Sequence, residues 1–177
     1  MVWSAADLRN LLTDHGITTV LIGAHAANRY RLEVRHTVDV DFLASSLTGV
    51  ADVLRSVGCT VREVSEDGET YLLSARIEST VIDLLLVETE YQRGAMSRAV
   101  DGVLTIEDVI IHKLIAGRPR DTDDIRSILS TGREFDESFV IENAKQWGVV
   151  ERWNEARTSG RGGTSHTSSW GFPHFRP

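Results

Sequence analysis

The sequence predicts an α/β fold in which a mixed sheet flanked by helices is followed by a C-terminal helical part. Apolar, β-branched runs alternate with amphipathic, helix-length segments up to about residue 90. The run at residues 80–87 is apolar almost throughout, which is typical of a central strand covered on both faces. After residue 90, the recognisable segments have helical periodicity only, and this change marks the helical part.

Local signals set the expected elements. Ser4 can cap a first helix with Asp7 at its third position, and Gly16 ends that helix. Gly23 likewise ends the first strand before a helix rich in small residues. The expected strands are residues 18–22, 37–43, 60–64, 70–77 and 80–87, with a hairpin turn at residues 66–68. The expected helices are residues 4–15, 24–30, 47–57, 106–116, 121–129, 136–147 and 150–157.

These elements predict one domain with two parts. Residues 1–90 form the sheet core, and residues 91–157 form the C-terminal helical part of the same domain. Residues 158–177 are rich in Gly, Ser and Thr and lack apolar periodicity, so we expect a disordered tail.

Composition limits the classes of protein and of site. An apolar fraction of 41% and a charged fraction of 25% are ordinary for a soluble globular protein. A single cysteine, Cys59, excludes an internal disulfide and argues against a Cys/His zinc site. The sequence has neither a signal-peptide pattern nor an apolar run of membrane-spanning length, so we expect a cytoplasmic protein with no membrane association. The net charge of −7 argues against sequence-blind nucleic-acid binding by the whole surface, although local arginine clusters leave room for a basic groove.

The first chemical signal is a pair of aspartates in the predicted strand 37–43. Residues two apart on a strand point the same way, so Asp39 and Asp41 share a face, and we expect the alternate residues Val38, Val40 and Phe42 to face the core. Two adjacent carboxylates raise each other's pKa unless a cation lies between them. Mg²⁺ usually takes one or two carboxylates together with water and substrate phosphates. Two solvated acids on an exposed strand are the alternative.

Asp83 strengthens the metal interpretation. It lies within the apolar run VIDLLL, where neither strand face is expected to be exposed. A buried carboxylate requires a cation or hydrogen-bond donors, because leaving it unpaired is expensive. An aspartate on a central strand, beside an Asp-x-Asp on another strand, is what a two-metal site needs. Pairing of Asp83 with an arginine or with backbone amides remains the alternative.

The motifs resemble those of the DNA polymerase β-like nucleotidyltransferases. The stretch LIGAHAANRYRLEVRHTVDVDFL resembles the start of that superfamily, in which a Gly-Gly or Gly-Ser pair opens a helix before Asp-x-Asp. The form Arg-x-Thr-x-Asp-x-Asp, here residues 35–41, is similar to that of the AbiEii/MenT-like group of toxin–antitoxin nucleotidyltransferases. The stretch EDVIIHKLIAGRPRDTDDI resembles a downstream motif of that group. The matching residues of this downstream motif are Lys113, Arg118, Arg120, Asp121 and Asp124.

The resemblance implies a nucleotidyltransferase-type fold and a Mg²⁺-dependent transfer of NMP from an NTP to a hydroxyl acceptor. It implies two Mg²⁺ ions on Asp39, Asp41 and Asp83. The implied catalytic residues are Asp83, Lys113 and Asp124. The implied nucleotide-binding residues are Gly23, Ala24, Arg35, Thr37, Lys113 and Arg120. The implied partners are the NTP, a tRNA or other RNA acceptor or a protein hydroxyl, and a cognate antitoxin or toxin.

Two other functional classes stay open. Ala24 stands where the superfamily has Gly or Ser, and this departure favours a protein that binds NTP or a partner without turnover. A small-molecule adenylyltransferase with an aminoglycoside-like substrate fits the same motifs, and the acidic net charge favours such a cationic acceptor. A metal site made with His25, His36 or His112 is a weaker alternative.

Overall fold

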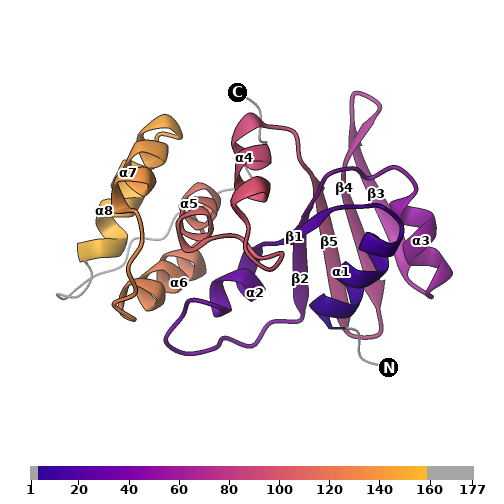
Figure 1. Cartoon of the computed structure of the whole chain (residues 1–177), viewed down its shortest axis with the longest axis horizontal. Helices are drawn as coiled ribbons and strands as arrows, with labels where there is room; N and C mark the ends of the chain where they lie inside the picture. The colour runs from indigo at the N-terminus through magenta and orange to yellow at the C-terminus, as the bar shows by residue number, and fades with distance from the viewer. Residues whose placement is uncertain (1–3, 159–177) are drawn as a thin grey trace. The chain divides into compact units, whose positions relative to one another are not determined.

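Five strands form a mixed sheet in the order β1-β2-β5-β4-β3 (Figure 1). The strands are β1 (Thr19–Leu21), β2 (Asp39–Ala44), β3 (Thr60–Glu66), β4 (Glu69–Ile77) and β5 (Thr80–Leu86). β2 and β5 run parallel, and the other neighbours are antiparallel. β5 lies in the middle of the five strands, as its apolar sequence predicts.

The main core lies between this sheet and two helices, α1 (Ala5–Asp14) and α3 (Val50–Ser56). α1 contributes Leu8 and Leu12, and α3 contributes Val50 and Leu54. The sheet residues that meet these helices are Val40, Phe42, Leu73, Ala75, Ile82 and Leu84. Val38 was expected on the same face, but it precedes the strand and is 47% exposed. Because side chains alternate along a strand, Asp39, Asp41 and Asp83 belong to the opposite face.

Capping and turn signals account for several element boundaries. The expected capping box of Ser4 and Asp7 is present at the start of α1. The β3–β4 hairpin turns at Asp67 and Gly68, both with positive φ, as a tight two-residue hairpin turn requires. Helix α4 (Glu90–Arg98) was not predicted, although its capping box, formed by Thr89 and Gln92, is readable in the sequence.

Four helices follow the sheet: α5 (Ile106–Ala116), α6 (Pro119–Leu129), α7 (Glu137–Gln146) and α8 (Val150–Thr158). Pro119 is the first residue of α6, where its missing N–H is harmless. The turn at residues 117–119 therefore separates two helices and does not kink one continuous helix.

The structure is a computed structural model that describes residues 4–158. Its packing separates two units, one of residues 4–29 and 34–105 and the other of residues 30–33 and 106–158. α4 packs with the sheet, so the packing boundary lies at Ile106, whereas the sequence placed the start of the helical part at residue 91. The tail predicted to be disordered lies outside the described residues, except for Thr158, which ends α8. No helix among residues 4–158 has the length and apolar character needed to cross a membrane.

The cap of α4 gives a test of this local analysis. The Thr89 hydroxyl accepts a hydrogen bond from the Gln92 N–H at 3.1 Å, so Thr89→Ala should lower the free energy of unfolding by about 1 kcal/mol. Ser97→Ala is the control, because it removes a hydroxyl from the same helix that is not a cap, and it should change the free energy by less than about 0.5 kcal/mol. Urea unfolding of both variants measures the difference, and equal midpoints would refute the assignment of the cap.

Candidate functional site

Three aspartates share one face of the sheet. The parallel register pairs Asp41 of β2 directly with Asp83 of β5, and Asp39 lies two residues before Asp41. All three residues are half-buried. The strand pairing thus brings two motifs together that lie some forty residues apart in sequence.

The environment of Asp83 is asymmetric. Its Oδ1 atom has no solvent access and no hydrogen-bond partner among the described residues. The residue on the neighbouring strand β4 that pairs with it is Ser74. A buried carboxylate oxygen without a partner is energetically unfavourable, which fits an atom that accepts a ligand or a proton during function. The sequence predicted a strand covered on both faces, but the Asp83 face is only partly covered in this unit.

Gly23 lies against Asp41. The Ile22 N–H donates to the Asp41 carbonyl at 2.9 Å, which places the turn that begins α2 (Gly23–Asn28) beside β2. Gly23 has a φ of +65°, and a Cβ at this position would overlap the Asp41 carboxylate. Glycine is therefore required both by the backbone and by the close approach of the carboxylate. Ala24, the next residue, is 8% exposed and packs inward.

The histidines contribute less to this site. Burial lowers the pKa of His25, and the charge of Asp39 partly opposes that shift, so the two residues are electrostatic neighbours. His36 is exposed, and His112 lies on α5. Among residues 4–158, no three His, Cys, Asp or Glu side chains already converge as a metal site. The alternative of a site containing histidine thus gains no geometric support, and the three aspartates do not form a closed cluster as they stand.

Arg35 and Thr37 have clear backbone roles. The Arg35 N–H donates to the Asn28 Oδ1 at 2.9 Å, and the Arg35 carbonyl accepts from the Asn28 Nδ2 at 2.8 Å. The Thr37 hydroxyl accepts from the Asp39 N–H at 3.3 Å, at the start of β2. Both residues therefore shape the approach of the chain to Asp39, whatever their contacts with a nucleotide. Arg120 is exposed on the first turn of α6.

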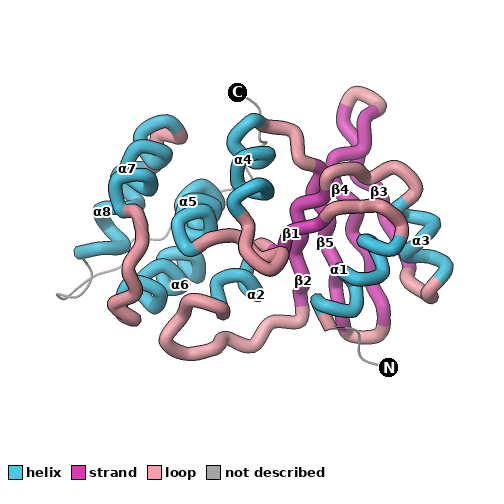
Figure 2. The backbone as a smooth tube through the Cα atoms, viewed as in Figure 1, coloured by secondary structure: helices cyan, strands magenta, loops and turns pink. Residues whose placement is uncertain are grey.

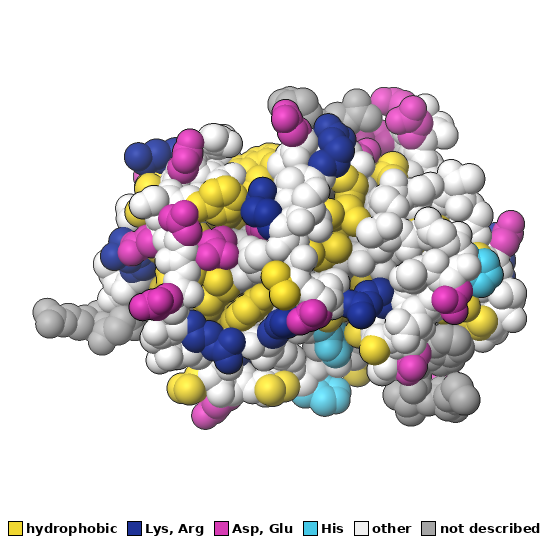
Figure 3. Space-filling view, in the orientation of Figure 1, with side chains coloured by type: hydrophobic (Ala, Val, Ile, Leu, Met, Phe, Trp, Pro, Cys, Tyr) yellow, Lys and Arg dark blue, Asp and Glu magenta, His cyan; other side chains and the backbone are white. Residues whose placement is uncertain are grey.

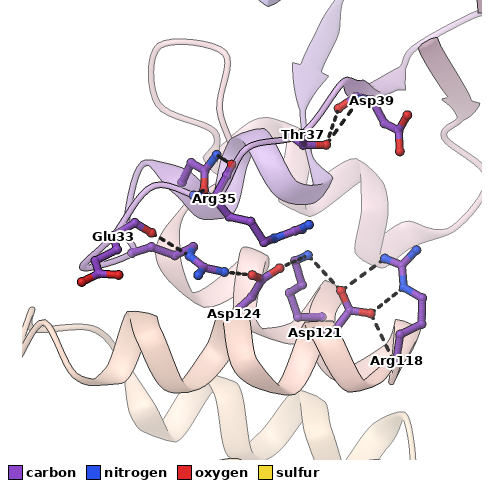
Figure 4. A network of polar contacts seen from close by, with 10 residues as sticks. Glu33, Arg35, Thr37, Asp39, Arg118, Asp121 and Asp124 are labelled. Atoms are coloured by element: carbon purple, nitrogen blue, oxygen red, sulfur yellow. Dashed lines mark hydrogen bonds and ion pairs between the residues drawn. The ribbon is translucent and has the colours of Figure 1, made fainter. Parts of the chain in front are cut away.

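The helical unit contains a buried cluster of charges (Figure 4). Lys113 Nζ donates to Asp124 Oδ2 at 2.6 Å and to Asp121 Oδ1 at 2.9 Å. The side chains are 4% exposed for Lys113 and no more than 1% exposed for either aspartate. The sequence placed Lys113 beside the apolar stripe of its helix, but the structure buries it. The pairing joins two separate helices, α5 and α6, and does not depend on a continuous helix.

Two arginines complete this cluster. Arg118 Nε donates to Asp121 Oδ2 at 2.6 Å, and Arg31 forms an ion pair with Asp124. Burial raises the pKa of Asp121, but the hydrogen bonds from Arg118 and the charge of Lys113 outweigh burial and hold that pKa below its usual value. Sequence reasoning missed Arg31 as a partner, because nothing local in the sequence links it to α6.

Comparisons with known proteins support the fold. A scan against protein-family models finds no match, and no curated protein sequence matches. The solution structure of the antibiotic-resistance factor ANT(2'')-Ia aligns with a TM-score of 0.60 and 13% identity over 87% of this chain and 94% of that chain. Its crystal structure with adenylyl-2''-tobramycin aligns with a TM-score of 0.49 and 13% identity over 87% and 95% of the two chains. An antigenic nucleotidyltransferase-like protein from Paracoccidioides brasiliensis aligns with a TM-score of 0.47 and 18% identity over 86% and 88%. The chain has a nucleotidyltransferase-type α/β fold.

The buried cluster predicts a large effect on stability. Lys113→Met removes the cation that both carboxylates share, and it should lower the free energy of unfolding by about 3 to 5 kcal/mol. Lys145→Met is the matched control, because Lys145 is the other lysine of the chain and is exposed on α7. Denaturant unfolding compares the two, and similar stability of both variants would show that the cluster does not stabilise the fold.

His112 predicts a pH dependence of stability. Burial lowers the pKa of His112 to about 4, so the unfolded chain binds more protons than the folded chain between about pH 6.5 and pH 4. The free energy of unfolding should therefore fall as the pH falls through this window, by up to roughly 3 kcal/mol. His112→Gln should flatten the slope, with His36→Gln as the control for loss of an exposed imidazole. A His112→Gln profile as steep as the wild-type profile would contradict this prediction.

Proposed function

We propose that this chain is a nucleotidyltransferase that moves NMP from an NTP to a hydroxyl acceptor. The observation that carries the proposal is the register pair Asp41 and Asp83, with Asp39 on the same sheet face and Gly23 against Asp41. The nucleotidyltransferase-type fold supplies the setting for these side chains. Fold alone does not imply an activity, so the proposal depends on the site.

The aspartates fit a divalent cation. Hard oxygen ligands from one or two carboxylates are what Mg²⁺ selects, and Asp83 Oδ1 is a buried acceptor that lacks a partner in the described structure. Asp39, Asp41 and Asp83 would hold up to two ions. Bound there, Mg²⁺ supplies positive charge that offsets the charge of the triphosphate and of the leaving pyrophosphate.

The protein groups have their own tasks in this proposal. The turn at Gly23 and Ala24 leaves room beside Asp41 for a phosphate group, because no side chain projects from Gly23. Asp83 accepts the proton of the acceptor hydroxyl, whose oxygen attacks the α-phosphorus as pyrophosphate leaves. Arg35 and the exposed Arg120 are candidates for contact with the phosphates, since the guanidinium fork suits phosphate oxygens.

The buried cluster changes the role proposed for two residues. Lys113 and Asp124 were expected to act on the substrate, but each saturates the other in a site with almost no solvent access. We therefore assign Lys113 and Asp124 to the architecture of the helical unit and not to contact with the triphosphate. This assignment explains why a lysine and two aspartates recur at this spacing without requiring any ligand.

The resemblance to the AbiEii/MenT-like group suggests an RNA 3′ end, such as that of a tRNA, or a protein hydroxyl as acceptor, and a toxin–antitoxin setting with a cognate partner. A small cationic acceptor is the second candidate. Two observations favour it: the net charge of −7, and the fold likeness to an antibiotic-resistance factor over 94% of that chain. Figure 3 shows acidic and basic side chains interspersed on the face that it presents, with no broad basic surface for RNA there.

The acceptor class can be tested directly. The wild-type chain is incubated with Mg²⁺ and each labelled NTP, together with total RNA, a candidate partner protein or an aminoglycoside. Label in RNA or protein supports the first class, and label in the small molecule supports the second. Binding of NTP without transfer would support the non-catalytic alternative raised by Ala24.

The metal assignment makes a sharper prediction. Asp39→Asn combined with Asp41→Asn should abolish Mg²⁺-dependent NTP binding and leave the fold intact, because the carboxylates bind the ions and are not needed for packing. In the absence of metal, relief of their mutual repulsion should keep or raise the melting temperature. Asp52→Asn, at an exposed position on α3, is the control for loss of one acidic charge. Calorimetry measures the affinity, and an unchanged affinity of the double variant would refute the assignment.

A further inference from the structure

The segment between α2 and β2, residues 29–38, is a long loop closed at its base (Figure 2). Asn28, the last residue of α2, forms two hydrogen bonds with the main chain of Arg35, at 2.8 and 2.9 Å. These two bonds hold both ends of residues 29–34 together in the sheet unit. The loop lies directly between the Gly23 turn and Asp39 in the chain.

The tip of this loop belongs to the other unit. Residues 30–33 pack with the helices of the second unit, whereas the residues on both sides pack with the sheet. Arg31 forms an ion pair with Asp124 of α6, and its Nε donates to the Glu33 carbonyl at 3.0 Å. The Arg31 side chain is 13% exposed and the Asp124 side chain 1% exposed, so this ion pair is almost fully desolvated.

Apolar packing does not explain the position of this tip. Leu32 is 66% exposed, and Val34, just beyond the tip, is 78% exposed. The buried ion pair of Arg31 is therefore the main anchor that the described contacts provide. A short loop that presents exposed apolar residues while burying an arginine is held by charge.

The anchor bears on the proposed metal site through the chain itself. Arg35 at the base of the loop is followed by Thr37, which hydrogen-bonds the Asp39 N–H, and Asp39 begins β2. A loop that loses its anchor samples more conformations, and binding must then order it again. Weakened binding in proportion to the population that remains competent is the expected result.

We propose that Arg31 is a positioning residue, which acts through Asp124 to keep loop 29–38 in the conformation that presents Asp39 to a metal-bound nucleotide. The inference rests on the proposed nucleotidyltransferase function for its kinetic consequence, but the restraint on the loop is a property of the chain alone. Arg31 itself touches no substrate in this proposal.

The test uses the full-length chain with Arg31→Gln. Hydrogen–deuterium exchange should be at least tenfold faster in peptides covering residues 29–38, with little change in peptides from β4. In the NTP assay, KM should rise roughly tenfold while kcat at saturating NTP stays within about twofold, because a saturating ligand restores the ordered loop. Arg31→Lys should recover part of both effects, since it keeps the charge but not the guanidinium fork.

Arg157→Gln is the matched control. Arg157 also pairs with an acid across two helices of the second unit, but that pair with Glu137 is on the surface. It should leave loop exchange and KM unchanged. If Arg31 acts through Asp124, Arg31→Gln combined with Asp124→Asn should raise KM no further than Asp124→Asn alone.

The outcomes separate this inference from its premise. If Arg31→Gln lowers the melting temperature but leaves KM and loop exchange within twofold of wild type, Arg31 has a stabilising role only and the inference is overturned. If the wild-type chain turns over no NTP, the proposed function fails, and exchange in residues 29–38 still decides whether Arg31 restrains the loop. Unchanged exchange in that case overturns the inference as well.

Discussion

The parallel pairing of β2 with β5 aligns Asp41 with Asp83, and the candidate site in the sheet unit is arranged around this pair. The apolar residues that alternate with these aspartates, Phe42 and Ile82 among them, face the core covered by α1 and α3. A slip of one residue in register would exchange the two faces and place carboxylates in the core. The hydrophobic core thus fixes the acids on the open face, and the Gly23 turn reaches Asp41 because β1 pairs with β2 on the other side.

The helical unit uses a different device. Lys113, Asp121 and Asp124 are buried together with contributions from Arg31 and Arg118, so three cations surround two carboxylates. A buried ion pair adds little net stability over well-packed apolar residues, but loss of one member is strongly unfavourable. Such a cluster tolerates few alternative arrangements of α5 and α6. It also explains how a loop of polar and exposed residues can be held in one place without an apolar anchor.

These two arrangements give different meanings to motifs that look equivalent in the sequence. The Asp-x-Asp of β2 is half-buried on an open face, and Asp83 keeps a buried oxygen without a partner, so both retain capacity for a ligand. Lys113 and Asp124 have used that capacity on each other. Burial and pairing, and not residue type, separate residues that can bind a substrate from residues that hold the fold.

The sequence by itself determined the α/β class, the capped start of α1, the β3–β4 hairpin, the central position of β5 and the shared face of Asp39 and Asp41. Each of these follows from periodicity, capping or turn chemistry, which are local. It missed α4, where the available signal was the capping pair Thr89 and Gln92. Only the tertiary structure decided that Asp41 faces Asp83, that Lys113 is buried between two aspartates, and that Arg31 pairs with Asp124. These contacts join residues far apart in the chain, and their geometry is set by strand register and helix packing, which no local pattern encodes.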